Sequence, residues 1–221
     1  MPLLSDFSGN ILPVTNNFTR WNGLLSDQIL SLDTIDNQIL IGSAQGAQLW
    51  SGSGKLLQTW TSELPHPYTQ RVYLDETRKI MGTYRGLYDP DTQETYLSPW
   101  SVFSMLRIDN ILWVGYDGLQ KFDFSTKEVS TVNSDIGTVY DITRVEDFIY
   151  LSSKLGLYRI VYQTQDPHFE EITPYVGNLL YVENDVGKDK YPWFAVESDG
   201  LITPKAKVWR EKSWSEDLQL S

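Results

Sequence analysis

ILSLDTIDNQILIGSAQGAQLW, from Ile29 to Trp50, is the stretch that decides the fold. It contains an apolar strand, an Asp-Asn turn, a second apolar strand, a short loop that ends in Gly, and a third strand. Four similar stretches follow, from Arg71 to Asp89, Ser104 to Asp123, Val139 to Ile160 and Leu179 to Ile202. Val, Ile, Tyr, Trp and Thr dominate the strands, and turn residues separate them, which is typical of an all-β protein.

One glycine closes the short loop of each copy, and the spacing of these glycines gives the repeat length. The spacings are 40, 32, 38 and 44 residues, with a mean of 38.5. This mean is close to the period of roughly 40–45 residues that four-stranded propeller blades show. Helical repeats are excluded because no segment keeps apolar residues at i, i+3, i+4 and i+7. The glycines are Gly46, Gly86, Gly118, Gly156 and Gly200.

The repeats predict a single β-propeller of five blades over residues 17–213. An N-terminal arm, 1–16, and a C-terminal tail, 214–221, lie outside it. Two segments compete for the outer strand of the last blade. One is Asn17–Trp21, which would latch the ring shut from the N-terminal side, and the other is Lys207–Arg210.

Acidic turn residues and one tryptophan complete the fold prediction. Asp and Asn side chains bond the backbone of their own turn, which accounts for an acidic pair in each of four repeats without any chemistry. We expect Trp113 to be buried between blades, because it lies in the uninterrupted apolar run Ile111–Val114. The acidic pairs are Asp36-Asn37, Asp75-Glu76, Asp109-Asn110 and Glu146-Asp147.

The segment from Phe18 to Ile160 resembles the propeller repeat of bacterial two-component sensor ectodomains. That repeat has a Gly-Leu turn, an aliphatic strand, an Asp turn, a Leu-Trp-Ile-Gly-Thr strand and a short loop to Gly-Leu. Ile41-Gly42-Ser43 with Gly46 fills these positions, and Leu112-Trp113-Val114-Gly115 with Gly118-Leu119 matches best. Gly82-Thr83 with Gly86-Leu87, and Gly156-Leu157, match in part. The resemblance implies the propeller fold. It does not imply a function, because the matching residues are structural ones.

Composition limits the classes of function that are open to the chain. The net charge is −11, with 18 basic and 29 acidic residues and no basic stripe, which argues against nucleic-acid binding. There is no cysteine, and His66 and His168 are the only histidines, so we expect no metal and no cofactor. The first residues, MPLLSDFSGNILPV, have no basic region and no long apolar run. We therefore expect no membrane contact and a cytoplasmic location, with a virion as the alternative.

Carboxylates near the inner strands are the candidates for catalysis. Five-bladed propellers include glycoside hydrolases, which need two carboxylates roughly 5–9.5 Å apart. Most of the carboxylates here coincide with turns, so only Asp33 and Asp141, which fall within strands, deserve inspection. Both histidines follow prolines in loops, far from any serine elbow. We expect no enzyme, with a glycoside hydrolase as the alternative. The candidates are Asp33, Asp75, Asp109, Asp141 and Glu183.

Loops that follow the second strand of each blade gather on one face of a propeller, together with the crossings between blades. Aromatic residues and Arg are enriched at interface hot spots, so this loop face is the predicted binding site. The alternative is that Trp100 and Tyr175 wedge between blades as core. The predicted binding residues are Gln45, Tyr84, Arg85, Trp100, Tyr116, Asp117, Lys154, Tyr175, Glu197 and Asp199.

The leading hypothesis is a non-enzymatic β-propeller scaffold that binds a protein or another ligand, with a protein as the expected partner. The alternative is a structural component of a larger assembly, such as a virion or a secretion machine, because the short irregular ends look like arms that need a partner. A second alternative is a glycan-binding or glycan-cleaving propeller, which the abundance of Trp and Tyr favours. The polar residues differ at equivalent loop positions, which favours one composite face over five equal lectin sites.

Overall fold

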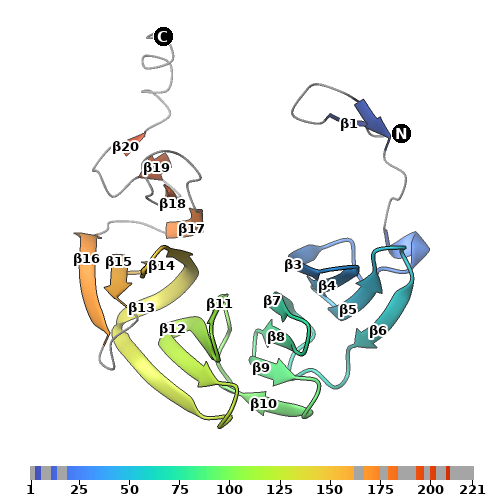
Figure 1. Cartoon of the computed structure of the whole chain (residues 1–221), viewed down its shortest axis with the longest axis horizontal. Helices are drawn as coiled ribbons and strands as arrows, with labels where there is room; N and C mark the ends of the chain where they lie inside the picture. Colours follow the sequence, from blue (N-terminus) through green and yellow to red (C-terminus); the bar gives the residue numbers. More distant parts are fainter. Residues whose placement is uncertain are drawn as a thin grey trace. The chain divides into compact units, whose positions relative to one another are not determined.

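The protein is described by a computed structural model over residues 3–5, 11–13, 19–161, 167–174, 179–183, 193–196, 200–202 and 208–209. Side chains are described for 19–161 and 167–171. Regular structure in this part of the chain is β throughout, apart from one short 3-10 turn, so the all-β prediction is confirmed (Figure 1). The chain has two compact units, Met1–Thr83 with Tyr88–Glu94, and Tyr84–Leu87 with Thr95–Ser221.

The strands lie in chain order within each sheet. The first four-stranded sheet contains β3 (Ile29–Ile35), β4 (Gln38–Ser43), β5 (Gly46–Ser51) and β6 (Leu56–Trp60). The second contains β7 (Thr69–Leu74), β8 (Lys79–Thr83), β9 (Gly86–Asp89) and β10 (Glu94–Tyr96). A six-stranded sheet contains β11 (Ser104–Ile108), β12 (Ile111–Asp123), β13 (Val129–Val145), β14 (Phe148–Ser153), β15 (Gly156–Val161) and β16 (His168–Pro174). The last sheet contains β17 (Leu179–Glu183), β18 (Trp193–Val196), β19 (Gly200–Ile202) and β20 (Val208–Trp209), and β1 (Leu3–Ser5) pairs with β2 (Ile11–Pro13).

The third and fourth repeats share one sheet, which the sequence does not predict. The strand β13 joins them, because its first part pairs with β12 and its second part, from Val139 onward, pairs with β14. No proline interrupts Val129–Val145, so the chain crosses from one repeat to the next as a single strand. The expected hairpin at Tyr116–Gly118 is instead a register shift within β12. Repeat boundaries therefore do not coincide with sheet boundaries here.

The predicted N-terminal latch strand is wrong for the residues that the structure describes. Arg20–Asn22 form a 3-10 turn, and Thr19 caps it by accepting a hydrogen bond from the Trp21 N–H. The Asn22 side chain bonds back to the Thr19 N–H, which completes a capping box. These local bonds fix a turn where the position of this segment before the first repeat suggested a strand. In the last sheet β20 pairs with β19, within the competing segment Lys207–Arg210, and Asn17 and Phe18 lie outside the described residues.

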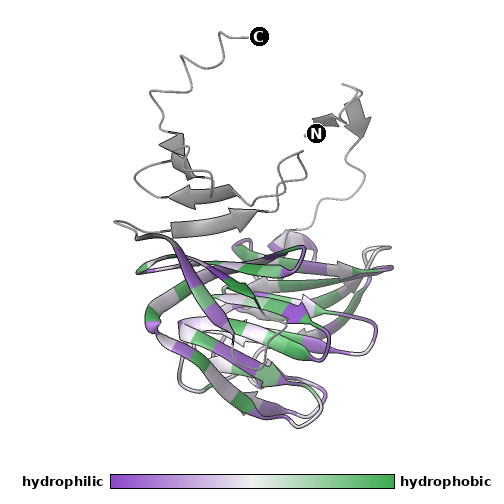
Figure 2. Cartoon of the chain, turned by 60° about the vertical axis from the view of Figure 1, so that its left-hand side comes forward, coloured by the Kyte–Doolittle hydropathy of each residue, from purple (hydrophilic) through white to green (hydrophobic). Residues whose placement is uncertain are grey.

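Each unit has its own hydrophobic core, and bands of hydrophobic residues cross the strands in Figure 2. In the second unit Trp113 is 2% exposed and packs in a cluster that includes Ile142 and Ile149, so its predicted burial is confirmed. Lys121 Nζ lies 4.4 Å from the Trp113 ring centroid, which covers one side of the indole with a cation. In the first unit the core contains Leu40, Ala47, Leu49, Trp60, Leu64, Val72, Leu74, Met81 and Tyr88.

Glycines in the second strand of a repeat let the next inner strand come close. A Cβ atom at Gly42 would lie 2.8 Å from the Thr69 carbonyl oxygen. A Cβ atom at Gly115 would lie 2.8 Å from the Val139 carbonyl oxygen, in the equivalent place of the second unit. Real side chains do not reach such distances, so only glycine permits this approach. The Gly of the Ile-Gly-Ser and Val-Gly-Tyr motifs is thus a packing requirement between successive strands.

Candidate functional site

The predicted binding residues occupy equivalent places in successive repeats. Gln45 lies in the turn between β4 and β5, Tyr84 and Arg85 between β8 and β9, and Lys154 between β14 and β15. Tyr116 and Asp117 lie at the register shift of β12. The side chains of Gln45, Arg85, Asp117 and Lys154 are all exposed. Tyr175, Glu197 and Asp199 lie outside the described residues.

Serines that precede the turns hold them in a fixed conformation. Ser43 Oγ donates to the Gly46 carbonyl at 2.9 Å and accepts from the Gln45 N–H at 3.3 Å. Ser153 Oγ makes the same bond to the Gly156 carbonyl at 3.1 Å. The turn glycines Gly46, Gly86 and Gly118 have φ values of 133°, 124° and 111°, which disfavour other residues. The exposed residues of these turns are therefore held on rigid supports.

The structure brings three of the predicted residues into one neighbourhood of the second unit. The Trp100 and Tyr116 ring centroids lie 5.8 Å apart, with the rings tilted by 48°. Ser101 Oγ donates to the Tyr84 carbonyl at 3.0 Å, which places Tyr84 beside the same segment. Trp100 is 50% exposed and Tyr84 is 42% exposed. We call Tyr84, Trp100 and Tyr116 the aromatic surface. Trp100 does not wedge into a core, so that alternative is wrong for Trp100, and Tyr175 lies outside the described residues.

A buried glutamine that the sequence analysis missed orients the aromatic surface. Gln120 Nε2 donates to Tyr116 Oη at 2.9 Å and to Thr131 Oγ1 at 3.1 Å. Gln120 is buried, so these bonds are protected from water and fix the phenol. Its signal in the sequence is an amide between the buried Leu119 and the half-buried Lys121. The arrangement presents flat aromatic rings, of which Tyr116 is held in place by a hydrogen bond to its hydroxyl, and such a surface suits contact with another protein.

Asp33, the first carboxylate to inspect, has a structural role. Its Oδ2 accepts from the Leu74 N–H at 2.7 Å, and its Oδ1 accepts from the Thr34 N–H at 2.8 Å. Ser31 Oγ accepts from the Val72 N–H at 3.1 Å in the same way. These two side chains of β3 therefore accept hydrogen bonds from the backbone N–H groups on the edge of β7 that does not pair with β8. Burial is the largest influence on the Asp33 carboxyl and raises its pKa, and the two backbone bonds oppose that effect.

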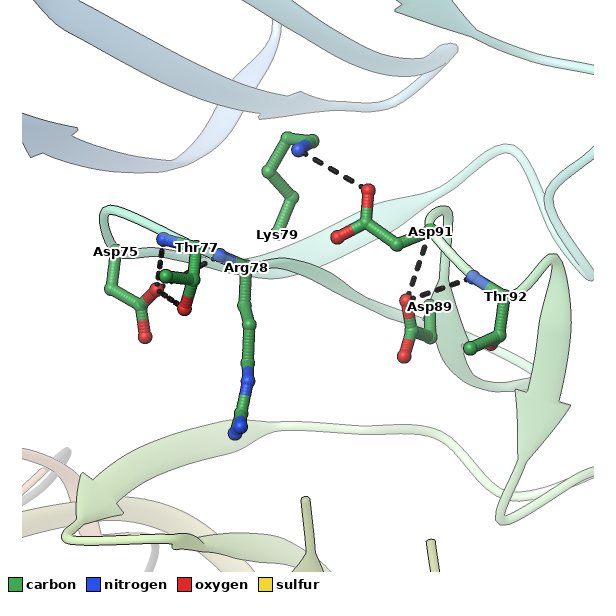
Figure 3. Close-up of polar contacts among 7 residues, drawn as sticks. All are labelled: Asp75, Thr77, Arg78, Lys79, Asp89, Asp91 and Thr92. Atoms are coloured by element: carbon green, nitrogen blue, oxygen red, sulfur yellow. Dashed lines mark hydrogen bonds and ion pairs between the residues drawn. The ribbon is translucent and has the colours of Figure 1, made fainter. Parts of the chain in front are cut away.

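Asp75 and Asp89 are turn residues, as Figure 3 shows. Asp75 Oδ1 accepts from the Thr77 N–H at 2.7 Å and from the Arg78 N–H at 2.8 Å. Asp89 Oδ1 accepts from the Asp91 N–H at 3.0 Å, and Asp91 forms an ion pair with Lys79 at 3.3 Å. The prediction that these acids stabilise turns is confirmed for Asp75. Backbone φ values of 47°, 54° and 54° at Asp36, Asp109 and Glu146 agree with the same role.

Asp141 and His66 are also tied into local structure, whereas the side chain of Glu183 lies outside the described residues. Asp141 is half-buried, and its Oδ1 accepts from the Ile142 N–H at 3.0 Å. His66 Nδ1 accepts from the Tyr68 N–H at 3.0 Å, so that imidazole closes a loop turn. His168 lies on β16 and is exposed. Among the described side chains no three His, Asp or Glu residues come together as a metal-binding group. No helix of the described ranges has the length and apolar character to cross a bilayer.

Comparison with known proteins shows the fold but no family. No protein-family model matches the sequence, and no curated protein matches it. The extracellular domain of the putative one component system BT4673 from B. thetaiotaomicron aligns with a TM-score of 0.69 and 15% identity, over 91% of this chain and 30% of that chain. The extracellular domain of the putative hybrid two component system BT3049 aligns with a TM-score of 0.59 and 16% identity, over 89% of this chain and 36% of that one. This chain thus spans about a third of these structures.

A third similar structure is PorZ, described as an essential bacterial surface component of the type-IX secretion system of Porphyromonas gingivalis. It aligns with a TM-score of 0.57 and 15% identity, over 84% of this chain and 28% of PorZ. The resemblance to two-component sensor ectodomains is therefore supported at the level of fold. The prediction of a cytoplasmic location is wrong, because the similar structures include extracellular domains. That prediction was based on the first residues of the sequence alone.

Proposed function

We propose that the chain is a non-enzymatic binding scaffold of the propeller type, whose five repeats act as five blades and whose aromatic surface holds a partner protein. The observation that carries this proposal is Trp100, a half-exposed indole beside Tyr116, in a unit where Trp113, the other tryptophan whose side chain the structure describes, is buried. Exposed aromatic side chains on rigid supports lose little conformational entropy when they bind. Arg85, in the turn between β8 and β9, and Asp117, at the register shift of β12, add charges of both signs, which suits a protein surface with mixed polarity.

The binding scaffold is best sought outside the cell, given the extracellular and surface proteins that share its fold. A catalytic role for the carboxylates is disfavoured, because Asp33 and Asp75 each accept two or more hydrogen bonds from their own surroundings. A structural part of a surface assembly is the second candidate function. The fold it shares with PorZ, a component of a secretion system, favours it.

Proximity labelling of the surface fraction tests the binding scaffold. A photo-crosslinking residue at Tyr84 should label one protein, and Trp100→Ala should abolish that label, because the indole supplies the largest exposed apolar contact there. Trp21→Ala is the matched control, since Trp21 is an exposed tryptophan of the first unit, and it should leave the label unchanged. Equal labelling by both variants would overturn the proposal. Recovery of the labelled protein in a larger complex would favour the second candidate.

A further inference from the structure

A hollow of about 400 Å³ lies beside the turn between β12 and β13. Its lining combines charges of both signs, hydroxyl groups and apolar side chains. All of the lining residues belong to the second unit, so no residue of the first unit takes part in it. The volume falls within the range of about 300–1,000 Å³ that is typical of small-molecule sites. We call this space the Lys121 hollow, and its lining includes Ile111, Lys121, Asp123, Glu128, Val129 and Ser130.

Strand register places the charged residues on one side of the six-stranded sheet. Lys121 and Asp123 are two residues apart on β12, so their side chains point to the same side, about 7 Å apart along the strand. Lys121 pairs with Ser130 of β13, and the Asp123 N–H donates to the Glu128 carbonyl at 3.0 Å. Lys121 Nζ also lies 4.4 Å from the Trp113 ring centroid, so this is the side of the sheet that carries the buried indole. The amine and the two carboxylates therefore line one space.

Local hydrogen bonds hold the turn that carries the carboxylates. Asp123 Oδ1 accepts from the Ser125 N–H at 2.7 Å and from Asn110 Nδ2 at 2.9 Å. Thr126 Oγ1 accepts from the Glu128 N–H at 3.3 Å. The bonds described for the Asp123 carboxylate all reach Oδ1, which leaves Oδ2 for a ligand. Groups that are already held in place lose little conformational entropy when a ligand binds.

Lys121 and Glu128 have no partner of opposite charge among the side chains that the structure describes. No ion pair of the described residues uses either of them. Lys121 Nζ lies over the Trp113 ring instead, and burial lowers the pKa of this amine. A partly buried cation without a counter-charge is unfavourable, and a ligand anion would reduce that cost. The Lys121 hollow therefore offers an unpaired cation and an unpaired carboxylate together.

These charges fit a ligand that carries both signs. An anion alone would face two carboxylates, and a cation alone would face Lys121. The strand positions of Lys121 and Asp123 are about 7 Å apart, and two charge-assisted hydrogen bonds take up about 2.8 Å each. The two charges of the ligand must therefore be close together, and in an α-amino acid a single carbon separates them. Ile111 and Val129 supply apolar contacts for its side chain.

We propose that the Lys121 hollow binds a free α-amino acid, whose carboxylate contacts Lys121 and whose ammonium group contacts Asp123 and Glu128. Lys121 Nζ donates to the ligand carboxylate, and Ser130, which pairs with Lys121, places a second donor beside it. The two protein carboxylates accept from the ligand ammonium. This site is separate from the aromatic surface and from the partner protein proposed there, so either can be absent without the other.

Calorimetric titration of the full chain with L-alanine tests the ligand class. L-Alanine should bind with a Kd of about 1 mM or tighter. Propionate and ethylamine are the matched ligands, because each keeps the carbon chain of alanine and only one of its two charges. Each should bind at least about tenfold more weakly, since it makes only one of the two charge-assisted contacts.

Variants of the lining test the assigned contacts. Lys121→Met keeps an unbranched chain over Trp113 but removes the ammonium group, and Glu128→Gln removes a carboxylate charge, so each should weaken L-alanine binding at least about tenfold. Lys127→Met is the matched control, since Lys127 lies in the same turn with its Nζ 5.7 Å from the Phe122 ring centroid and outside the lining. It should bind like the wild type. Thermal unfolding establishes that each variant is folded, and Lys121→Gln replaces Lys121→Met if the latter is not.

Three results would each overturn the proposal. The first is a wild-type chain that shows no binding of L-alanine at about 10 mM. The second is propionate or ethylamine that binds as tightly as L-alanine. The third is an equal effect of Lys121→Met and Lys127→Met on the affinity.

Discussion

The two units contain the same kind of strand-to-strand junction, but different side chains stabilise it. In the first, β4 approaches β7 at Gly42, and the polar side chains Ser31 and Asp33 bond the edge of β7. In the second, β12 approaches β13 at Gly115, and the large apolar Trp113 packs against the next strands. The glycine is common to both because backbone distance requires it. The side chains around the glycine differ between the two junctions. The repeat therefore specifies how closely the two strands approach, but not which interactions stabilise the junction.

The largest expected effect is at the apolar junction. Trp113→Ala should lower the free energy of unfolding by about 3–5 kcal/mol, because it leaves a large cavity in a packed core. Trp100→Ala is the comparison, and it should cost less than about 1 kcal/mol because half of that indole is exposed. Urea unfolding of both variants measures the difference. Equal losses of unfolding free energy in the two variants would mean that the packing of Trp113 does not stabilise the junction between β12 and β13.

The common glycines come next. Gly42→Ala and Gly115→Ala should each cost about 1–3 kcal/mol, because the new Cβ would overlap a carbonyl oxygen of the next strand. Similar losses in the two units would support one shared spacing. Gln58→Ala, at an exposed position of β6, provides the baseline. A change at Gly42 no larger than that baseline would contradict the close approach.

At the junction between β3 and β7, stability should depend on the hydrogen-bond acceptor of Asp33 more than on its negative charge. Asp33→Ala leaves the Leu74 N–H without its partner and should cost about 1–3 kcal/mol. Asp33→Asn keeps one oxygen for that bond and should cost less than about 1 kcal/mol. Asp91→Ala, which removes an exposed ion pair with Lys79, is the surface control and should lie within about 1 kcal/mol of the wild type. Equal costs for Ala and Asn at position 33 would show that the negative charge matters.

The smallest expected effect is the pH dependence of this junction. Burial raises the pKa of Asp33 above 3.8, so folding favours its protonated form. Its contribution is fully present below pH 3.8 and is lost as pH rises through the raised folded pKa. The stability of the wild type relative to Asp33→Asn should therefore increase as pH falls from neutral toward 3.8. Unfolding of both proteins across this range measures it, and a relative stability that falls instead would contradict the role of burial.

Local sequence was sufficient for the features that depend on near neighbours. Glycine spacing, the Asp75 turn and the burial of Trp113 within Ile111–Val114 were all predictable, because turn geometry and apolar runs act over a few residues. The capping box at Thr19 and Asn22 is equally local, but the position of this segment before the first repeat favoured a strand in the prediction. The positions of Tyr84, Arg85 and Lys154 in turns followed from the same repeat.

The sequence by itself determined an all-β chain with a repeated glycine and acidic turns, since these follow from backbone conformation. Tertiary structure alone decided that Asp33 serves β7 and that Gln120 holds Tyr116. The partners in each case lie far apart in the chain or in a neighbouring sheet. A strand pattern specifies which side chains share a side of the sheet, but burial and hydrogen bonding depend on what lies against that side.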